Sequence, residues 1–188
     1  NVRNFDDVDH VISNFGYKDG QLYSDTSFSP YNFDGTSCFE WRQGVKHDCS
    51  KVMELTWNEE SFVNGRKELV DIEKNIVYPL IKSSMFKKPI INSFKKYVIV
   101  TQRKAKEPTD HLQLDVPKTW AYLQQHLEDF QKRKSSIYAN APEFSMFGVG
   151  DYSYSPYKVG VSGFYKQPLF SVLYSDDGIP VMTDDTSY

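Results

Sequence analysis

Short apolar segments separated by turn residues constrain this chain more than any other feature of its sequence. Asn64-Gly65 and the 176–178 run Asp-Asp-Gly are strong turn signals. They separate runs that are apolar, β-branched or aromatic and read as strands, at residues 37–45, 51–57, 68–72, 97–101, 157–165, 169–174 and 179–182. We therefore predict a single α+β domain with a mostly antiparallel sheet.

Helical spacing of apolar residues is found in fewer places. The longest helix is predicted at about 119–134, with Thr119 as its N-cap. A short or kinked helix is predicted at 73–86, where Pro79 interrupts the pattern. At the N-terminus, a short helix over 4–16 and an irregular loop over 17–36 are expected to belong to the same domain as residues 37–188.

Composition limits the class of protein. The 188 residues are about one domain's worth, with 39% hydrophobic and 25% charged side chains. No window is apolar enough to span a membrane, and the first residues lack the apolar core of a signal peptide. Two cysteines, Cys38 and Cys49, are too few for a disulfide scaffold, so we expect a cytoplasmic protein.

Positive charge is concentrated in one block. The net charge is −3, yet residues 82–106 hold eight basic and no acidic side chains. Such a block makes a positive face that suits phosphate groups, although a solvated lysine-rich loop would have the same composition. We expect this block to share a face with the polar turn at 42–47. The predicted phosphate contacts are Lys82, Lys87, Lys88, Arg103, Lys104, Lys106 and Lys134.

Signatures of common enzymes are missing from the sequence. No Gly-Lys-Ser or Gly-Lys-Thr of a P-loop occurs, and the glycines at 147–151 are followed by residues that do not start a helix readily. Cys38, His47 and Cys49 lack the paired spacing of zinc ligands. No acidic residue has a lysine two positions later, as metal-dependent nucleases often have.

Several stretches in a fixed order resemble a known protein region. They are WRQGVKHD at 41–48, IEKNIVYPLIK at 72–82, PKTWAYL at 117–123, RKSSIY at 133–138, FSMFGVGDY at 144–152 and PYKV at 156–159. Together they resemble the C-terminal target-recognition region of Taq-type N6-adenine DNA methyltransferases of bacterial restriction-modification systems. The resemblance covers about residues 37–188.

The resemblance implies that this chain reads DNA and that another domain performs the chemistry. In that family a separate domain binds S-adenosylmethionine and carries an Asn-Pro-Pro-Tyr or Asp-Pro-Pro-Tyr motif, which is absent here. The expected partners are double-stranded DNA and the catalytic domain of the same parent chain, with no cofactor in this chain. A protein-interaction domain and a metal-dependent nuclease are the alternatives.

Base contacts are expected from two places. Arginine, lysine, asparagine and glutamine recognise base edges in the major groove, and tyrosines near a basic residue can contact DNA. On residue types alone, a polar turn and half-buried strand tyrosines are equally good interpretations. With the resemblance, the predicted base contacts are Arg42, Gln43, Lys46, His47, Tyr152, Tyr154 and Lys158.

Overall fold

The computed structural model describes residues 16–18, 21–23, 38–162 and 169–184. The chain divides into two compact units, Asn1–Phe39 and Glu40–Tyr188. In the first unit, β1 (Gly16–Lys18) pairs antiparallel with β2 (Gln21–Tyr23), within the region where a loop was predicted. The helix predicted over residues 4–16 lies outside the described residues, apart from Gly16, which begins β1.

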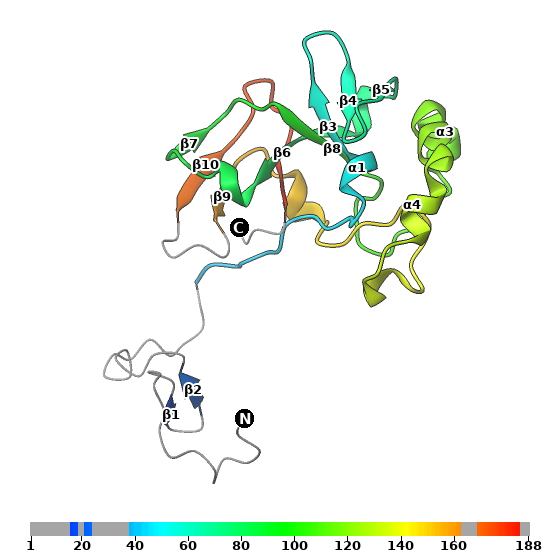
Figure 1. Ribbon diagram of the computed structural model, residues 1–188. Coiled ribbons are helices and arrows are strands. Elements are labelled where there is room, and N and C mark those ends of the chain that lie inside the picture. Colours follow the sequence, from blue (N-terminus) through cyan, green and yellow to red (C-terminus); the bar gives the residue numbers. More distant parts are fainter. Residues whose placement is uncertain (1–15, 19–20, 24–37, 163–168, 185–188) are drawn as a thin grey trace. The chain divides into compact units, whose positions relative to one another are not determined.

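A six-stranded sheet forms the centre of the second unit (Figure 1). Its strand order is β11-β6-β8-β3-β4-β5, and every neighbouring pair is antiparallel except β11 and β6. The strands are β3 (Glu54–Trp57), β4 (Phe62–Asn64), β5 (Leu69–Val70), β6 (Val77–Lys82), β8 (Lys96–Ile99) and β11 (Met182–Asp184). This mixture of helices and mostly antiparallel strands confirms the predicted α+β class.

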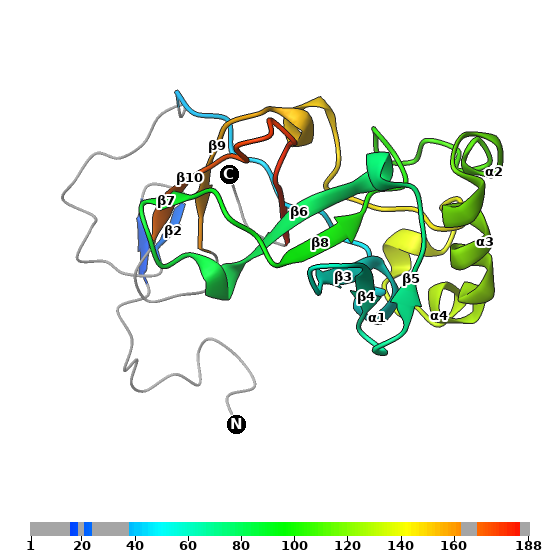
Figure 2. The same ribbon diagram turned by 90° about the horizontal axis from the view of Figure 1, so that it is seen from above.

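A smaller sheet is made of β7 (Ile90–Ile91), β9 (Lys158–Val161) and β10 (Phe170–Leu173). The central β10 pairs antiparallel with β9 and parallel with β7. In Figures 1 and 2 it lies on the side of the six-stranded sheet away from α2, α3 and α4. On its inner face, Leu173 of β10 belongs to a small buried cluster with Ile81, Phe86 and Val181.

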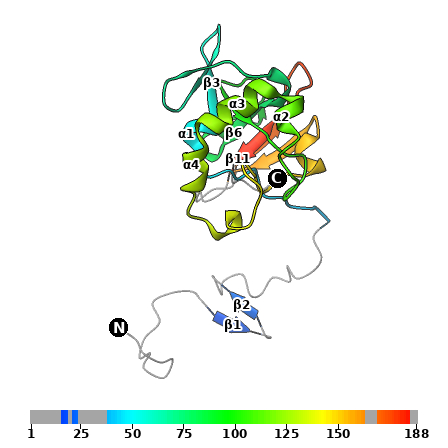
Figure 3. The ribbon, with the colours of Figure 1, turned by 90° about the vertical axis from the view of Figure 1, so that its right-hand side faces the viewer.

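The helices are short. They are α1 (Ser50–Met53), α2 (Leu112–Asp115), α3 (Pro117–Gln125) and α4 (Leu127–Gln131), with 3₁₀ turns η3 (Lys74–Ile76), η4 (Ser83–Met85), η5 (Ser136–Tyr138) and η6 (Asp151–Tyr154). The last three α-helices lie together on one side of the sheet (Figure 3). They cover the main core, in which Phe144 packs edge-on against Trp120 and Phe130.

Two predicted elements differ from the structure. The predicted helix at 119–134 is divided, because the backbone of His126 leaves helical geometry (φ −110°, ψ 17°) and separates α3 from α4. The predicted helix at 73–86 is mainly the strand β6. Its Leu80 and Ile81 are both fully buried, and a strand covered on both faces gives a continuous apolar run rather than an alternating one.

The segment before α1 also differs from its prediction. Residues 37–45 were predicted to form a strand, but their described part makes only isolated bridges. Val45 bridges to Asp184 of β11, and the neighbouring Lys46 bridges to Phe147. This segment is therefore held between two elements that come later in the chain.

Candidate nucleic-acid interface

Two arginines lie over two tyrosines of the 3₁₀ turn η6. The guanidinium of Arg42 is 5.2 Å from the ring centroid of Tyr152, and that of Arg103 is 4.4 Å from the ring centroid of Tyr154. Arg42, Arg103 and Lys104 are exposed, and both tyrosines are half-buried. We call Arg42, Arg103, Lys104, Tyr152 and Tyr154 the η6 surface. Stacking on a ring restricts a guanidinium to one plane and leaves the N–H groups at its edge accessible. Arg42 also forms an exposed ion pair with the carboxylate of Glu40, which is a weak interaction in water.

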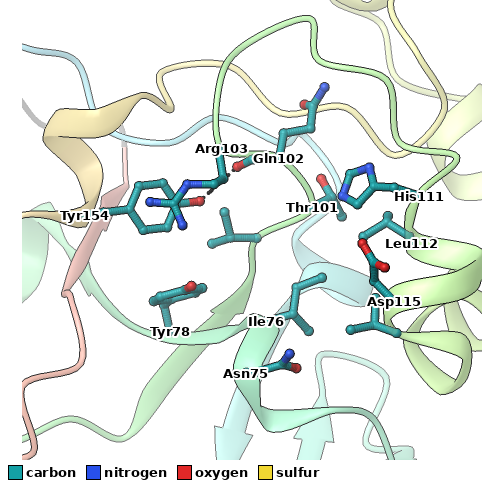
Figure 4. Close-up of a pocket in the computed structure, with 12 residues that line it drawn as sticks. Asn75, Ile76, Tyr78, Thr101, Gln102, Arg103, His111, Leu112, Asp115 and Tyr154 are labelled. Carbon is teal, nitrogen blue, oxygen red and sulfur yellow. Dashed lines mark hydrogen bonds between the residues drawn. The ribbon is translucent and has the colours of Figure 1, made fainter.

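Tyr154 is fixed from several sides (Figure 4). Its hydroxyl donates to the backbone carbonyl of Gln102 at 2.9 Å, and its ring packs edge-on against Tyr78, 5.6 Å between centroids. Burial raises the pKa of Tyr154 above its ordinary value, so the phenol is protonated at neutral pH. The ring is therefore a rigid, uncharged support for Arg103.

A pocket of about 310 Å³ opens beside this support. Figure 4 shows Arg103 and Tyr154 on one side of it, and His111 and Asp115 on the other. The side chain of Gln102 at its wall is already used, because it accepts from the backbone N–H of Met146 at 2.6 Å and donates to the carbonyl of Glu107. Gln102 thus ties together the loops that carry Arg103 and η6.

Arg42 is positioned by close backbone packing around Gly44. Val45 donates its N–H to the carbonyl of Thr183, and Lys46 donates to that of Phe147, both at 2.7 Å. A Cβ on Gly44 would lie 2.4 Å from the carbonyl oxygen of Thr183. A Cβ on Gly148, which has φ +65°, would lie 2.0 Å from the carbonyl oxygen of Gly44. The two glycines therefore let this segment pass between its neighbours.

This packing also explains the glycines at 147–151. The carbonyl of Gly44 occupies the space in which a side chain at position 148 would lie. Gly148 therefore allows the two backbone segments to contact each other. The arrangement agrees with the interpretation that this stretch is not a phosphate-binding turn.

Lys82 lies in a second charged cluster, at the other end of β6. Its ammonium is 2.7 Å from Glu54 Oε1 and 3.3 Å from Asp184 Oδ2. Burial opposes its charge, but the hydrogen bond and charge of Glu54, with Asp184 beside it, raise the pKa of Lys82 above its ordinary value. Two carboxylates already neutralise this ammonium, so it is poorly suited to hold a phosphate.

The basic block is divided between the two ends of the β6–β8 strand pair. Because β6 and β8 run antiparallel, Lys82 and Lys88 follow one end of the pair, whereas Arg103 and Lys104 follow the other. The turn at 42–47 is divided between the two ends as well. Arg42 contacts η6, and Lys46 lines a pocket with Lys82. The expected shared positive face would therefore have to extend over both ends of this strand pair, and it stays a prediction.

Two predicted base contacts are buried. Lys158 is 7% exposed, and its ammonium donates to the carbonyls of Ser155 and Val181, both at 2.8 Å. His47 is 4% exposed, and its Nδ1 accepts from the backbone N–H of Cys49 at 3.1 Å. Burial lowers the pKa of His47 although Glu54 acts in the opposite direction, so the imidazole is neutral at pH 7. Neither side chain is presented to a DNA base in this structure, so we remove both from the set of base contacts.

The other predicted residues are accessible. Gln43 is exposed beside Arg42, and Lys46 is half-buried. Lys104 makes an exposed ion pair with Asp151 at 3.6 Å, which is a weak interaction in water. The remaining predicted phosphate contacts, all exposed, are Lys87, Lys88, Lys106 and Lys134.

No local sequence pattern indicates the role of Arg133. Its guanidinium lies 3.8 Å from the ring centroid of Tyr138 and donates to the carbonyl of Ser145 at 2.7 Å and to that of His47 at 3.3 Å. It links the segment after α4 to the segments at 47 and 145. Partners so distant in sequence cannot be identified from local spacing.

The described residues contain neither a metal-binding cluster nor a membrane-spanning helix. Within the described residues, no group of three or more His, Cys, Asp or Glu side chains is placed to hold a metal ion. The same part of the chain has no helix that is both long and apolar enough to cross a bilayer.

Comparison with known proteins identifies a relative. No protein-family model matches the chain. Over 156 residues, 83% of its length, the chain is 44% identical to the Type II methyltransferase M.NspV of Nostoc sp.. The chain spans only 32% of the length of that enzyme. It is therefore a relative of a Type II methyltransferase and corresponds to about a third of it.

Proposed function

We propose that this chain is a non-catalytic module that recognises a specific sequence in double-stranded DNA on behalf of a larger restriction-modification adenine-N6 methyltransferase. The observation that carries the proposal is the 44% identity to a methyltransferase over only 32% of that enzyme's length. A segment that matches a minor part of a methyltransferase, and lacks the Asn-Pro-Pro-Tyr motif, is suited to a role other than methyl transfer.

The η6 surface supports a role in DNA binding. It combines three exposed cations with two aromatic rings, on a chain whose net charge is −3. Phosphates attract such cations, and arginines can also donate two hydrogen bonds to one guanine. An acidic body with a small cationic surface favours one orientation on the duplex.

Arg42 of this surface and its neighbour Gln43 are the proposed base readers. Both are exposed on the segment that Gly44 and Val45 anchor, and their side chains have the bidentate geometry that distinguishes guanine or adenine. Arg103 and Lys104 are the proposed phosphate contacts next to them. We assign structural roles to Lys158, which is buried, and to Lys82, which is paired with two carboxylates.

The parent protein would supply the chemistry. We propose that S-adenosylmethionine is bound by the catalytic domain of the parent, outside this chain, and that the adenine is methylated there. The module described here would hold that domain at its target sequence.

DNA binding tests the proposal directly. A duplex is first selected from a randomised pool with the 188-residue chain, and affinities for selected and scrambled duplexes are then measured at two salt concentrations. We expect tighter binding to the selected duplex and a steep loss of affinity with salt. Equal affinity for both duplexes, or no salt dependence, would contradict the proposal.

Variants separate the two kinds of contact. Arg42→Ala or Gln43→Ala should weaken binding to the selected duplex by about 1–3 kcal/mol and leave binding to the scrambled duplex nearly intact. Arg103→Ala together with Lys104→Ala should weaken both and reduce the salt dependence. Lys132→Ala is the control, because Lys132 is an exposed cation directly after α4 that pairs with Glu128.

A further inference from the structure

One face of the three-stranded sheet is apolar and exposed. Ile90 is 54% exposed, Val159 55%, Phe170 53% and Val172 40%. Val172 is paired with Ile90 on one side and with Val159 on the other, so these side chains are neighbours across the strands. Trp41, 48% exposed, adds its ring 6.2 Å from that of Phe170. We call Trp41, Ile90, Val159, Phe170 and Val172 the apolar face.

The opposite face of the same sheet is already covered. Between the exposed residues of β10, Ser171 and Leu173 are buried, and in β9 Gly160 is buried. A Cβ on Gly160 would lie 2.6 Å from the ring of Phe86, which shows how closely the inner layer is packed. Strands with one covered face normally carry polar residues on the other, whereas the uncovered face of these strands is apolar.

A cluster of this kind differs from single exposed apolar residues. Leu69 and Leu114 are 75% and 86% exposed, but each belongs to a different element, and such isolated positions are common on protein surfaces. A contiguous patch of aromatic and β-branched side chains without a charged member has the composition of an interface core.

We propose that the apolar face docks the part of the parent methyltransferase that this chain does not contain. This inference rests on the proposed function. The chain matches 32% of the length of the Nostoc enzyme, so about two thirds of such an enzyme has no counterpart here. In the proposed function, that part is joined to the module. The face has no cation to hold phosphate, which favours a protein over DNA as its occupant.

The position of the face suits this role. Trp41 of the apolar face and Arg42 of the η6 surface are consecutive residues, so the docking site and the DNA site adjoin along one segment. Gly44 and Val45 anchor that segment to β11. A domain docked on the apolar face would therefore lie beside the DNA that the η6 surface holds.

Association in trans tests the inference. The segment of the Nostoc methyltransferase outside the 156 matched residues is expressed alone, and its binding to the 188-residue chain is measured by calorimetry. The matched Nostoc segment serves as the positive control. The test variant combines Val159→Thr, Phe170→Thr and Val172→Thr, because threonine keeps the strand preference and removes apolar surface. The control variant combines Leu69→Thr and Leu114→Gln.

We expect the wild-type chain and the control variant to bind, and the test variant to bind at least about tenfold more weakly. Far-UV circular dichroism and thermal unfolding show that each variant is folded. The inference is overturned if the wild-type chain does not bind or if the test variant binds equally well. It is also overturned if the chain forms a dimer that the three threonines dissociate.

Parallel DNA titrations keep this inference distinct from the proposed function. The threonine variant should retain the DNA affinity of the wild type, whereas Arg42→Ala should retain association with the Nostoc segment and lose DNA discrimination. Loss of DNA binding in every chain, with association intact, would refute the proposed reader and leave the docking face standing. If the threonine variant lost DNA affinity instead of association, the apolar face would belong to the DNA site and the docking inference would be wrong.

Discussion

Lys158 is an ammonium held inside the protein by two backbone carbonyls. Burial lowers its pKa to about 8, from an ordinary value of 10.5. Between these two values the unfolded chain binds a proton that the folded chain has lost, so the free energy of unfolding contributed by Lys158 rises with pH. We predict that this contribution increases by about 1–2 kcal/mol between about pH 7.5 and about pH 9.5.

The pH-dependent contribution of Lys158 to the free energy of unfolding is isolated by comparing urea unfolding of the wild type with that of Lys158→Met. The methionine leaves two carbonyls unpaired at every pH, so the destabilisation that this causes does not depend on pH. Only the slope of the free energy of unfolding against pH should differ between the two proteins. The pKa of Tyr122, which burial raises to about 12, acts above pH 10 and lies outside the window. Lys88→Met is the control, because Lys88 is exposed. Parallel pH profiles for wild type and Lys158→Met would show that the buried ammonium does not titrate here.

At the scale of elements, the carboxylate of Glu73 caps the N-terminus of α3. The backbone N–H of Lys118 donates to Glu73 at 2.9 Å, and the N–H and hydroxyl of Thr119 donate to it at 2.8 and 2.7 Å. Thr119 was predicted to be the N-cap, but the helix begins at Pro117, and Thr119 is a buried residue of its first turn. Burial opposes the charge of Glu73, yet these hydrogen bonds lower its pKa to about 2.

We predict that Glu73→Ala destabilises the protein by about 1–2 kcal/mol at neutral pH, the usual effect of losing a cap. A lowered pKa stabilises the folded state above the ordinary value of 4.5, and this stabilisation is lost as the pH falls toward 2. The difference between wild type and variant should therefore shrink over that range in thermal unfolding experiments. Glu128→Ala, which removes an exposed pair with Lys132, is the control and should change stability by less than about 0.5 kcal/mol. A difference that does not depend on pH would mean that Glu73 acts through packing and not through its charge.

Local chemistry predicted those elements that depend on nearby residues. The run YVIVT at 97–101 correctly predicted the strand β8, and Asn64-Gly65 correctly predicted the turn between β4 and β5. The strand β6 was missed because both of its faces are covered, and its apolar run then looks helical. At the candidate site, Arg42 is exposed, and its role in base contact stays a prediction. The burial of Lys158 depends on carbonyls of Ser155 and Val181, and a partner 23 residues away leaves no local pattern.

At the scale of the whole molecule, we predict that the 188-residue chain does not methylate DNA by itself. Methyl transfer needs a site for S-adenosylmethionine and a site for the adenine. The glycine that could open a cofactor turn, Gly148, packs against the carbonyl of Gly44, and no Asn-Pro-Pro-Tyr or Asp-Pro-Pro-Tyr sequence occurs in the chain.

Incubation with radiolabelled S-adenosylmethionine and the selected duplex should leave the DNA unlabelled. The cofactor should also leave the melting temperature unchanged, because a ligand that does not bind the folded state does not stabilise it. The full-length Nostoc methyltransferase is the positive control for the assay. Label incorporated by the purified chain would place catalysis within these residues and refute the proposed reader.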